Sequence, residues 1–126
     1  MDFAAIGRLR FGTGLLACLL MAASGLLHSA MGWPAVKRAL SGADATTVAG
    51  LAVPWHFAGG AMMAFAALAA YCLVGAVQAN TSLLVPVRFI AIAYLLFGLV
   101  GLVLIKPDPT FLMFLIPGAM LLFASR

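Results

Sequence analysis

The amino-acid sequence predicts an all-α integral membrane protein, an up-down four-helix bundle with a long loop between its first and second helices. Of the 126 residues, 66% are apolar and 8% are charged, whereas soluble domains carry about a quarter charged residues. The mean hydropathy is +1.20. With so few polar side chains the chain cannot cover a surface that faces water, so we expect one domain that crosses a lipid bilayer.

Four apolar segments predict four spans within a single domain, residues 1–126. The spans cover about residues 11–33, 54–78, 86–105 and 110–125. A helix needs about 20 apolar residues to cross the hydrocarbon core, and the first three segments have that length. The fourth is shorter, and Pro117 predicts a kink in its middle. A signal peptide cleaved after Ser29-Ala30 is the alternative for the first segment, but its apolar run is long for one.

The connections between the spans contain the chain's turn and capping residues. The longest runs from Pro34 to Val53, with a short helix at Ala35–Leu40 and a second short turn capped by Asp44. Long loops in compact domains often serve as lids or binding loops. Before the fourth span, Asp108 is expected to act as an N-cap.

The charged residues predict the orientation. Four spans place both termini on one side, which collects four cationic residues, against three on the other side. The first set is Arg8, Arg10, Arg88 and Arg126, and the second is Lys37, Arg38 and Lys106. The positive-inside rule then favours cytoplasmic termini, in a bacterial inner membrane.

Trp33 and Trp55 are expected to anchor the outer interface, and Arg88 the inner head groups. The cations form no basic run, which argues against nucleic-acid binding.

Small residues at helical spacing predict close helix packing, since van der Waals contact drives association in lipid. Two such stripes are Gly14, Cys18, Ala22 and Gly25 on the first span and Tyr94, Gly98 and Gly101 on the third. A further glycine face predicts a homo-oligomer or a place in a larger membrane complex. Cys18 and Cys72 lie in apolar runs and are expected to be buried thiols.

The two histidines of the chain, His28 and His56, define the candidate site. His28 ends the first span and His56 begins the second, so antiparallel helices bring both to the outer face at similar depth. Gly60 and Met63 share the face of His56 at i+4 and i+7. If the faces of the two helices meet, small residues leave room for a ligand beside the imidazoles.

Imidazole nitrogens ligate haem iron, copper and zinc, and methionine sulfur can join them. We therefore expect haem b between His56 and His28, with Met63 and Gly60 beside it. A single zinc or copper ion would need more ligands, and Asp44 is the nearest acid. Two alternatives stay open: the histidines are interfacial anchors, or they handle protons. No carboxylate lies inside a span, which argues against a proton-coupled transporter.

Around His56 the chain resembles the styrene oxide isomerase family of small four-helix membrane proteins. The shared features are the four-span layout, the long first loop, His56 at the start of the second span, and nearby Gly and Met62-Met63. The resemblance implies that His56 holds haem b. In that family the haem iron acts as a Lewis acid in epoxide rearrangement. The family's Asn six residues after the histidine is Met62 here, so the resemblance supports haem binding better than epoxide chemistry.

The sequence therefore predicts a small membrane protein with an interfacial two-histidine site that binds haem b and acts as a Lewis-acid isomerase on a small apolar substrate. The alternative is a non-catalytic membrane subunit that docks on a larger complex or binds lipid, with its histidines as interfacial anchors.

Overall fold

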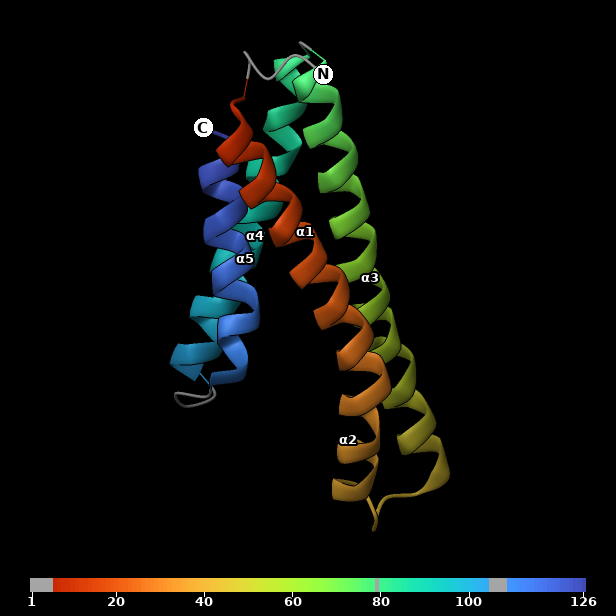
Figure 1. The fold of residues 1–126 in the computed structure, drawn as a ribbon. Helices are drawn as coiled ribbons and strands as arrows, with labels where there is room; N and C mark the ends of the chain where they lie inside the picture. The colour runs from red at the N-terminus through yellow and green to blue at the C-terminus, as the bar shows by residue number, and fades with distance from the viewer. Residues whose placement is uncertain (1–5, 79, 105–108) are drawn as a thin grey trace.

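The computed structural model describes residues 6–78, 80–104 and 109–126, and its regular elements are all helical (Figure 1). In chain order they are α1 (Arg8–Leu27), the π-helical segment η1 (His28–Gly32), α2 (Trp33–Ala39), α3 (Ala45–Val77), the 3-10 turn η2 (Thr81–Leu83), α4 (Leu84–Leu104), the 3-10 turn η3 (Pro109–Phe111) and α5 (Leu112–Ala124). The described ranges contain no strand, which confirms the all-α prediction. The predicted cap at Asp108 lies outside the described residues.

Three helical segments are long and apolar enough to cross a membrane. They are Arg8–Ala39, with 32 residues, Ala45–Val77, with 33, and Thr81–Leu104, with 24. The fourth, Leu112–Ala124, is apolar but has 13 residues, which at helical rise is about 20 Å. Pro117 lies inside it, as predicted, and is buried.

The predicted long loop between the first two helices is wrong. α2 follows α1 directly through η1, and α3 begins at Ala45 rather than at Pro54, so the connection shrinks to residues 40–44. Pro34 occupies the first turn of α2, where its missing N–H is not needed. Asp44 caps α3, because its Oδ1 accepts a hydrogen bond from Thr47 N at 3.0 Å. Pro54 is accommodated inside α3.

The cap at Asp44 carries charge. Hydrogen bonds from the Thr47 side chain and backbone hold the pKa of Asp44 below its ordinary value. The carboxylate is therefore ionised at neutral pH, and it lies at the helix end where the macrodipole is positive.

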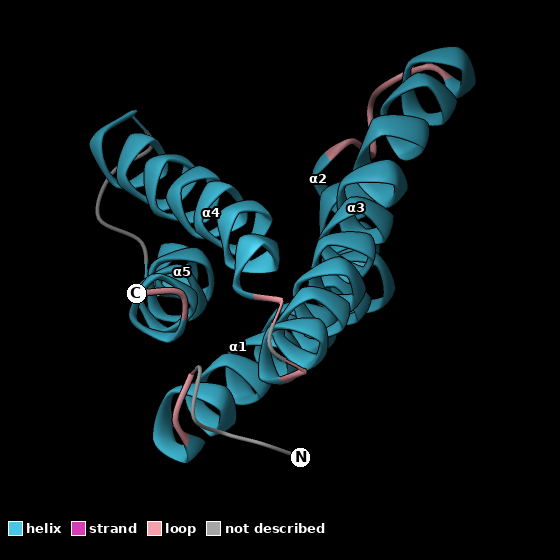
Figure 2. Cartoon of the chain, turned by 90° about the horizontal axis from the view of Figure 1, so that it is seen from above, coloured by secondary structure: helices cyan, strands magenta, loops and turns pink. Residues whose placement is uncertain are grey.

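The helices alternate in direction and form two unequal pairs. α1 packs against α3 and α5, and α4 packs against α5 and α3; seen from above, α2 lies beside α3 while α5 lies against α4 (Figure 2). The hairpin formed by α1, η1, α2 and α3 extends well beyond the lower ends of α4 and α5 (Figure 1). Each arm is about 48–50 Å long at 1.5 Å per residue, whereas a hydrocarbon core is about 30 Å thick.

Close backbone approach joins α1 to α3. A Cβ atom on Gly25 would lie 2.6 Å from the carbonyl oxygen of Gly59, and a Cβ on Gly59 would collide with the Ser29 hydroxyl. Gly60, one residue on, has open space around it. The prediction of close packing through small residues is confirmed for Gly25, which meets Gly59 of α3. Cys18 and Cys72 are both free and buried, also as predicted.

Candidate functional site

Four aromatic rings gather where the hairpin passes the ends of α4 and α5; we call them the aromatic cluster. His28 of η1 stacks on Trp55 of α3, with ring centroids 4.2 Å apart and planes 12° apart. Trp33 of α2 meets His56 edge-on at 5.6 Å and Trp55 at 6.4 Å. The two histidines thus lie at the same end of the hairpin, as predicted, but two indole rings connect them.

The π-helical segment fixes the position of Trp55. Its indole Nε1 donates a hydrogen bond to the His28 carbonyl oxygen at 2.9 Å. Gly32 makes room for the indole, since a Cβ there would lie 2.8 Å from Cζ2 of Trp55. π-Helical turns are rare and are frequent at functional sites. The hydrogen bond, the stack and the small residue together hold the His28 imidazole in one orientation.

A cavity of about 250 Å³ adjoins this end of the bundle. It is lined by His28 of η1, by Ala58, Ala61, Met62 and Phe65 of α3, by Ala93, Tyr94 and Phe97 of α4, and by Phe114 of α5. Apart from His28 and Tyr94 the lining side chains are apolar. The cavity is partly open, and its size is close to the lower end of ligand pockets, which hold about 300–1,000 Å³.

Two polar atoms of the cavity-lining residues have no hydrogen-bond partner within the described part of the chain. They are Nε2 of His28 and the hydroxyl oxygen of Tyr94, and both are buried. Buried polar groups are almost always hydrogen-bonded, because a group without a partner loses its contact with water and gains nothing in return. The two residues come from different helices and line one apolar space, although each of the two atoms has almost no exposed surface of its own.

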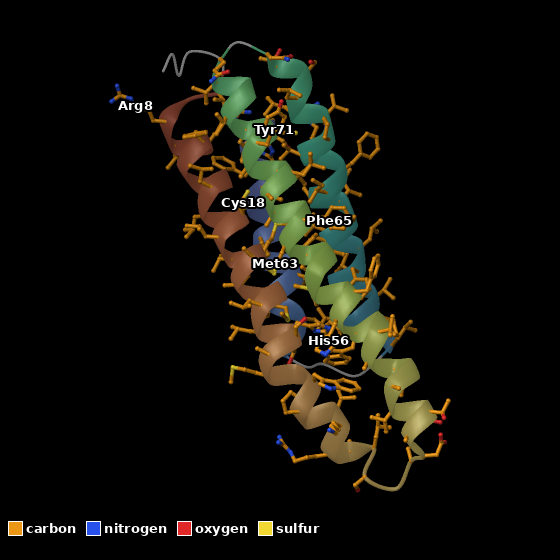
Figure 3. All side chains as sticks on the ribbon, turned by 90° about the vertical axis from the view of Figure 1, so that its right-hand side faces the viewer. Arg8, Cys18, His56, Met63, Phe65 and Tyr71 are labelled. Carbon is orange, nitrogen blue, oxygen red and sulfur yellow. The ribbon has the colours of Figure 1, made fainter. Side chains whose placement is uncertain are left out.

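The structure separates the predicted site residues. His28 lines the cavity, but His56 does not; it is exposed and contacts Trp33. Met63 lines a different apolar groove between α1 and α3, and Gly60 faces open space. Figure 3 shows His56, Met63 and Phe65 in ascending order along α3.

Helical geometry explains the separation. His56, Gly60 and Met63 share one face of α3, while Ala58, Met62 and Phe65 line the cavity. The second set is displaced by two residues from the first, which turns it by about 200° around the helix axis. The side chain that accompanies His28 in the cavity is therefore Met62, not Met63.

Sequence reasoning did not assign Tyr94 to the site. The spacing of Tyr94, Gly98 and Gly101 predicts a packing stripe on this helix, with Tyr94 as part of it. The sequence feature that could have indicated this role is helical spacing. Tyr94 and Phe97 are three residues apart, so they share a face of α4, and both line the cavity.

The ligand set at the cavity suits an apolar molecule better than a bare ion. Among the described residues no group of three or more His, Cys, Asp or Glu side chains could hold a metal. For haem, His28 offers one imidazole nitrogen without a partner, whereas His56 is outside the cavity. A space of about 250 Å³ admits a small molecule whole but only part of a porphyrin.

Comparisons with family models, curated proteins and solved structures found nothing that matches this chain.

Proposed function

We propose that this protein crosses a bacterial inner membrane, with its termini in the cytoplasm, and binds a small apolar molecule that carries one hydrogen-bonding group. The proposal rests on two residues that line one apolar cavity, His28 and Tyr94. Each carries a buried polar atom, His28 Nε2 and the Tyr94 hydroxyl oxygen, that has no partner among the described residues. The three long apolar helices support the membrane location. Lys37 and Arg38 at one end and Arg10 and Arg88 at the other suit the two head-group layers.

The chemistry of the cavity narrows the class of ligand. Apolar walls supply affinity, and a few placed polar groups orient the ligand. A buried polar group without a partner costs about 1–3 kcal/mol, and a ligand oxygen that pairs with it recovers part of that cost. A neutral imidazole and a phenol can each donate or accept a hydrogen bond. Small aromatic ketones, quinones and phenols therefore fit the proposed site, and charged molecules do not.

Replacing Tyr94 with Phe should have opposite effects on stability and on binding. The variant removes a buried hydroxyl without a partner, so we expect the ligand-free protein to gain about 1 kcal/mol. It also removes one of the two orienting groups, so stabilisation by acetophenone should fall. Thermal unfolding in detergent, with and without acetophenone, measures both effects. Ethylbenzene, which lacks the oxygen, is the control; equal stabilisation of wild type and variant by acetophenone would contradict the assignment of Tyr94.

Haem b is the second candidate, and the unpartnered Nε2 of His28 is the observation that favours it. In this arrangement His28 rather than His56 would hold the haem, and Met62 rather than Met63 would lie beside it. When bound, the haem iron would supply the Lewis acidity that isomerisation of a small apolar substrate needs. Because the cavity is small, α4 and α5 would have to move away from α3 to admit the whole macrocycle.

An absorption spectrum of detergent-purified protein, produced with added haem precursor, tests this candidate. The haem candidate predicts a Soret band that His28→Ala removes and His56→Ala retains. A band that only His56→Ala removes would restore the ligand predicted from the sequence. A flat spectrum from the wild-type protein would exclude haem. The docking-subunit alternative predicts a different set of results. The protein would be colourless, would co-purify with another membrane protein and would show no saturable binding of acetophenone.

A further inference from the structure

The C-terminal end of α5 is held by two arginines from two other helices. Arg10 of α1 donates from Nη2 to the Ala124 carbonyl at 3.2 Å, and Arg88 of α4 donates from Nε to the Ser125 carbonyl at 2.6 Å. Ser125 itself is buried, and its N and Oγ donate to the carbonyls of Leu121 and Leu122. The last carbonyls of α5 are thus satisfied by these side chains and by the final turn.

These contacts bring two positive charges to the same end of α5. The two acceptor carbonyls belong to consecutive residues, whose Cα atoms are about 3.8 Å apart. The negative end of a helix dipole offsets only about half an elementary charge. In the part of the chain that the structure describes, the one acidic side chain is Asp44, which caps α3 at the opposite end of the hairpin. Neither arginine is therefore paired with a carboxylate side chain among the described residues.

The arginines also keep hydrogen-bonding capacity. A guanidinium has five N–H donors, and Arg88 uses only Nε in its bond to the Ser125 carbonyl while its side chain is exposed. Arg10 is half-buried, and its own Nε has no partner among the described residues. The hydrogen bond to a carbonyl already restricts each arginine side chain, so the side chain loses less conformational entropy when it binds a second hydrogen-bond acceptor. Planar guanidinium groups are well suited to phosphate oxygens.

The length of the first helical segment suits a position of the arginine pair at the level of a membrane head group. Arg10 and Trp33 belong to one continuous helical segment, Arg8–Ala39, and their 23-residue separation corresponds to about 35 Å of helix. That length slightly exceeds the hydrocarbon core of about 30 Å. With Trp33 and Trp55 at one interface, Arg10 and Arg88 reach the phosphates of the other leaflet.

We propose that Arg10 and Arg88 form a binding site for the phosphate of an anionic phospholipid in the leaflet at the C-terminal end of α5. The lipid supplies a negative charge to two guanidinium groups whose bonds to the chain are made to neutral carbonyls. Its phosphodiester bridges the two guanidinium groups and thereby strengthens the contact of α1 and α4 with α5.

Lipid binding can be measured on the full chain in detergent by native mass spectrometry and by thermal unfolding. The probes are phosphatidylglycerol, phosphatidylcholine with the same acyl chains, and inorganic phosphate. We expect wild type to retain its first phosphatidylglycerol at a concentration at least tenfold lower than phosphatidylcholine. The double variant Arg10→Gln/Arg88→Gln should lose that preference. The matched control Lys37→Gln/Arg38→Gln removes two charges from the opposite end and should keep it.

Equal retention of the two lipids by the wild-type protein would overturn the proposal, whether or not the arginine variant folds. A phosphatidylglycerol preference that the control pair removes and the arginine pair keeps would place the lipid at the other end. Stabilisation by inorganic phosphate equal to that by phosphatidylglycerol would assign the site to free phosphate and also overturn the lipid assignment. If the double variant does not fold, Arg88→Lys tests the site, because it keeps the charge and loses the planar fork; a reduced preference is expected.

Discussion

Gly59→Ala is expected to destabilise the protein by about 1–3 kcal/mol, the usual cost of forcing a methyl group into a closely packed contact. The new Cβ would meet the Ser29 hydroxyl and would lie 2.7 Å from the Gly25 carbonyl oxygen. A backbone atom cannot turn away as a flexible side chain can, so α1 and α3 must separate. Thermal unfolding in detergent measures the loss, and the fluorescence of Trp55 reports the disturbed stack on His28.

Gly60→Ala is the matched control, because it adds the same atom at the neighbouring position of α3. No atom lies within 4 Å of the Cβ that it introduces. Alanine also favours a helix over glycine by about 1 kcal/mol. The variant should therefore be as stable as wild type or more stable. If Gly59→Ala and Gly60→Ala unfold at the same temperature, the close approach of α1 to α3 is not what holds the hairpin.

Trp55→Phe is expected to cost about 1–3 kcal/mol, because the His28 carbonyl within η1 loses its donor. The smaller ring also reduces the stack that orients the imidazole. We therefore expect stabilisation by acetophenone to fall together with the unfolding temperature. The matched variant is Trp33→Phe. In the wild-type protein the indole of Trp33 has an edge-on contact with His56, and the hydrogen bond to the His28 carbonyl of η1 comes from Trp55 instead.

Thermal unfolding and ligand-induced stabilisation distinguish these two tryptophan variants. The proposed site requires a larger loss of binding in Trp55→Phe than in Trp33→Phe. The reverse order would show that the ligand lies on the exposed side of the aromatic cluster, near His56, rather than in the cavity.

The class of the fold could be predicted from the sequence because it depends on composition. Apolar runs of spanning length, few charges and polar turns give the helices and their alternating directions. The cap at Asp44 was predictable for a local reason, because an N-cap needs only a short side chain with a hydrogen-bond acceptor before the helix. The contact of Gly25 with Gly59 was predictable in the same way, because close approach of two helices needs residues without side chains.

The faces of the helices could not be predicted in the same way. α3 is apolar on all sides, so no polar stripe shows which side faces the interior. The choice of the face with His56, Gly60 and Met63 rested on the histidine alone, and the cavity is on the opposite face. The long loop is predicted because residues 34–53 are the least apolar part of the chain, and because Pro54 is expected to begin the second span. In the structure Pro34 begins a helix, as predicted, but Pro54 lies inside α3.

The π-helical segment was also beyond the reach of sequence patterns. Its hydrogen bonds differ from those of an α-helix only by a shift of one residue, and the bond from Trp55 to the His28 carbonyl is made between distant parts of the chain. Tertiary contact decides such a feature. His28 belongs to this segment, and only the structure shows that it lines one cavity together with Tyr94.

The measurement that tests the central claim most directly is nuclear magnetic resonance of the imidazole nitrogens in protein labelled with ¹⁵N-histidine. The chain has two histidines, so one variant, His56→Gln, assigns the spectrum. We predict that acetophenone shifts the Nε2 resonance of His28 in a saturable manner, leaves His56 unchanged and loses this effect in Tyr94→Phe, while ethylbenzene produces no comparable shift. A His28 resonance that does not move, or that moves equally with ethylbenzene, would contradict a hydrogen-bonding site between His28 and Tyr94.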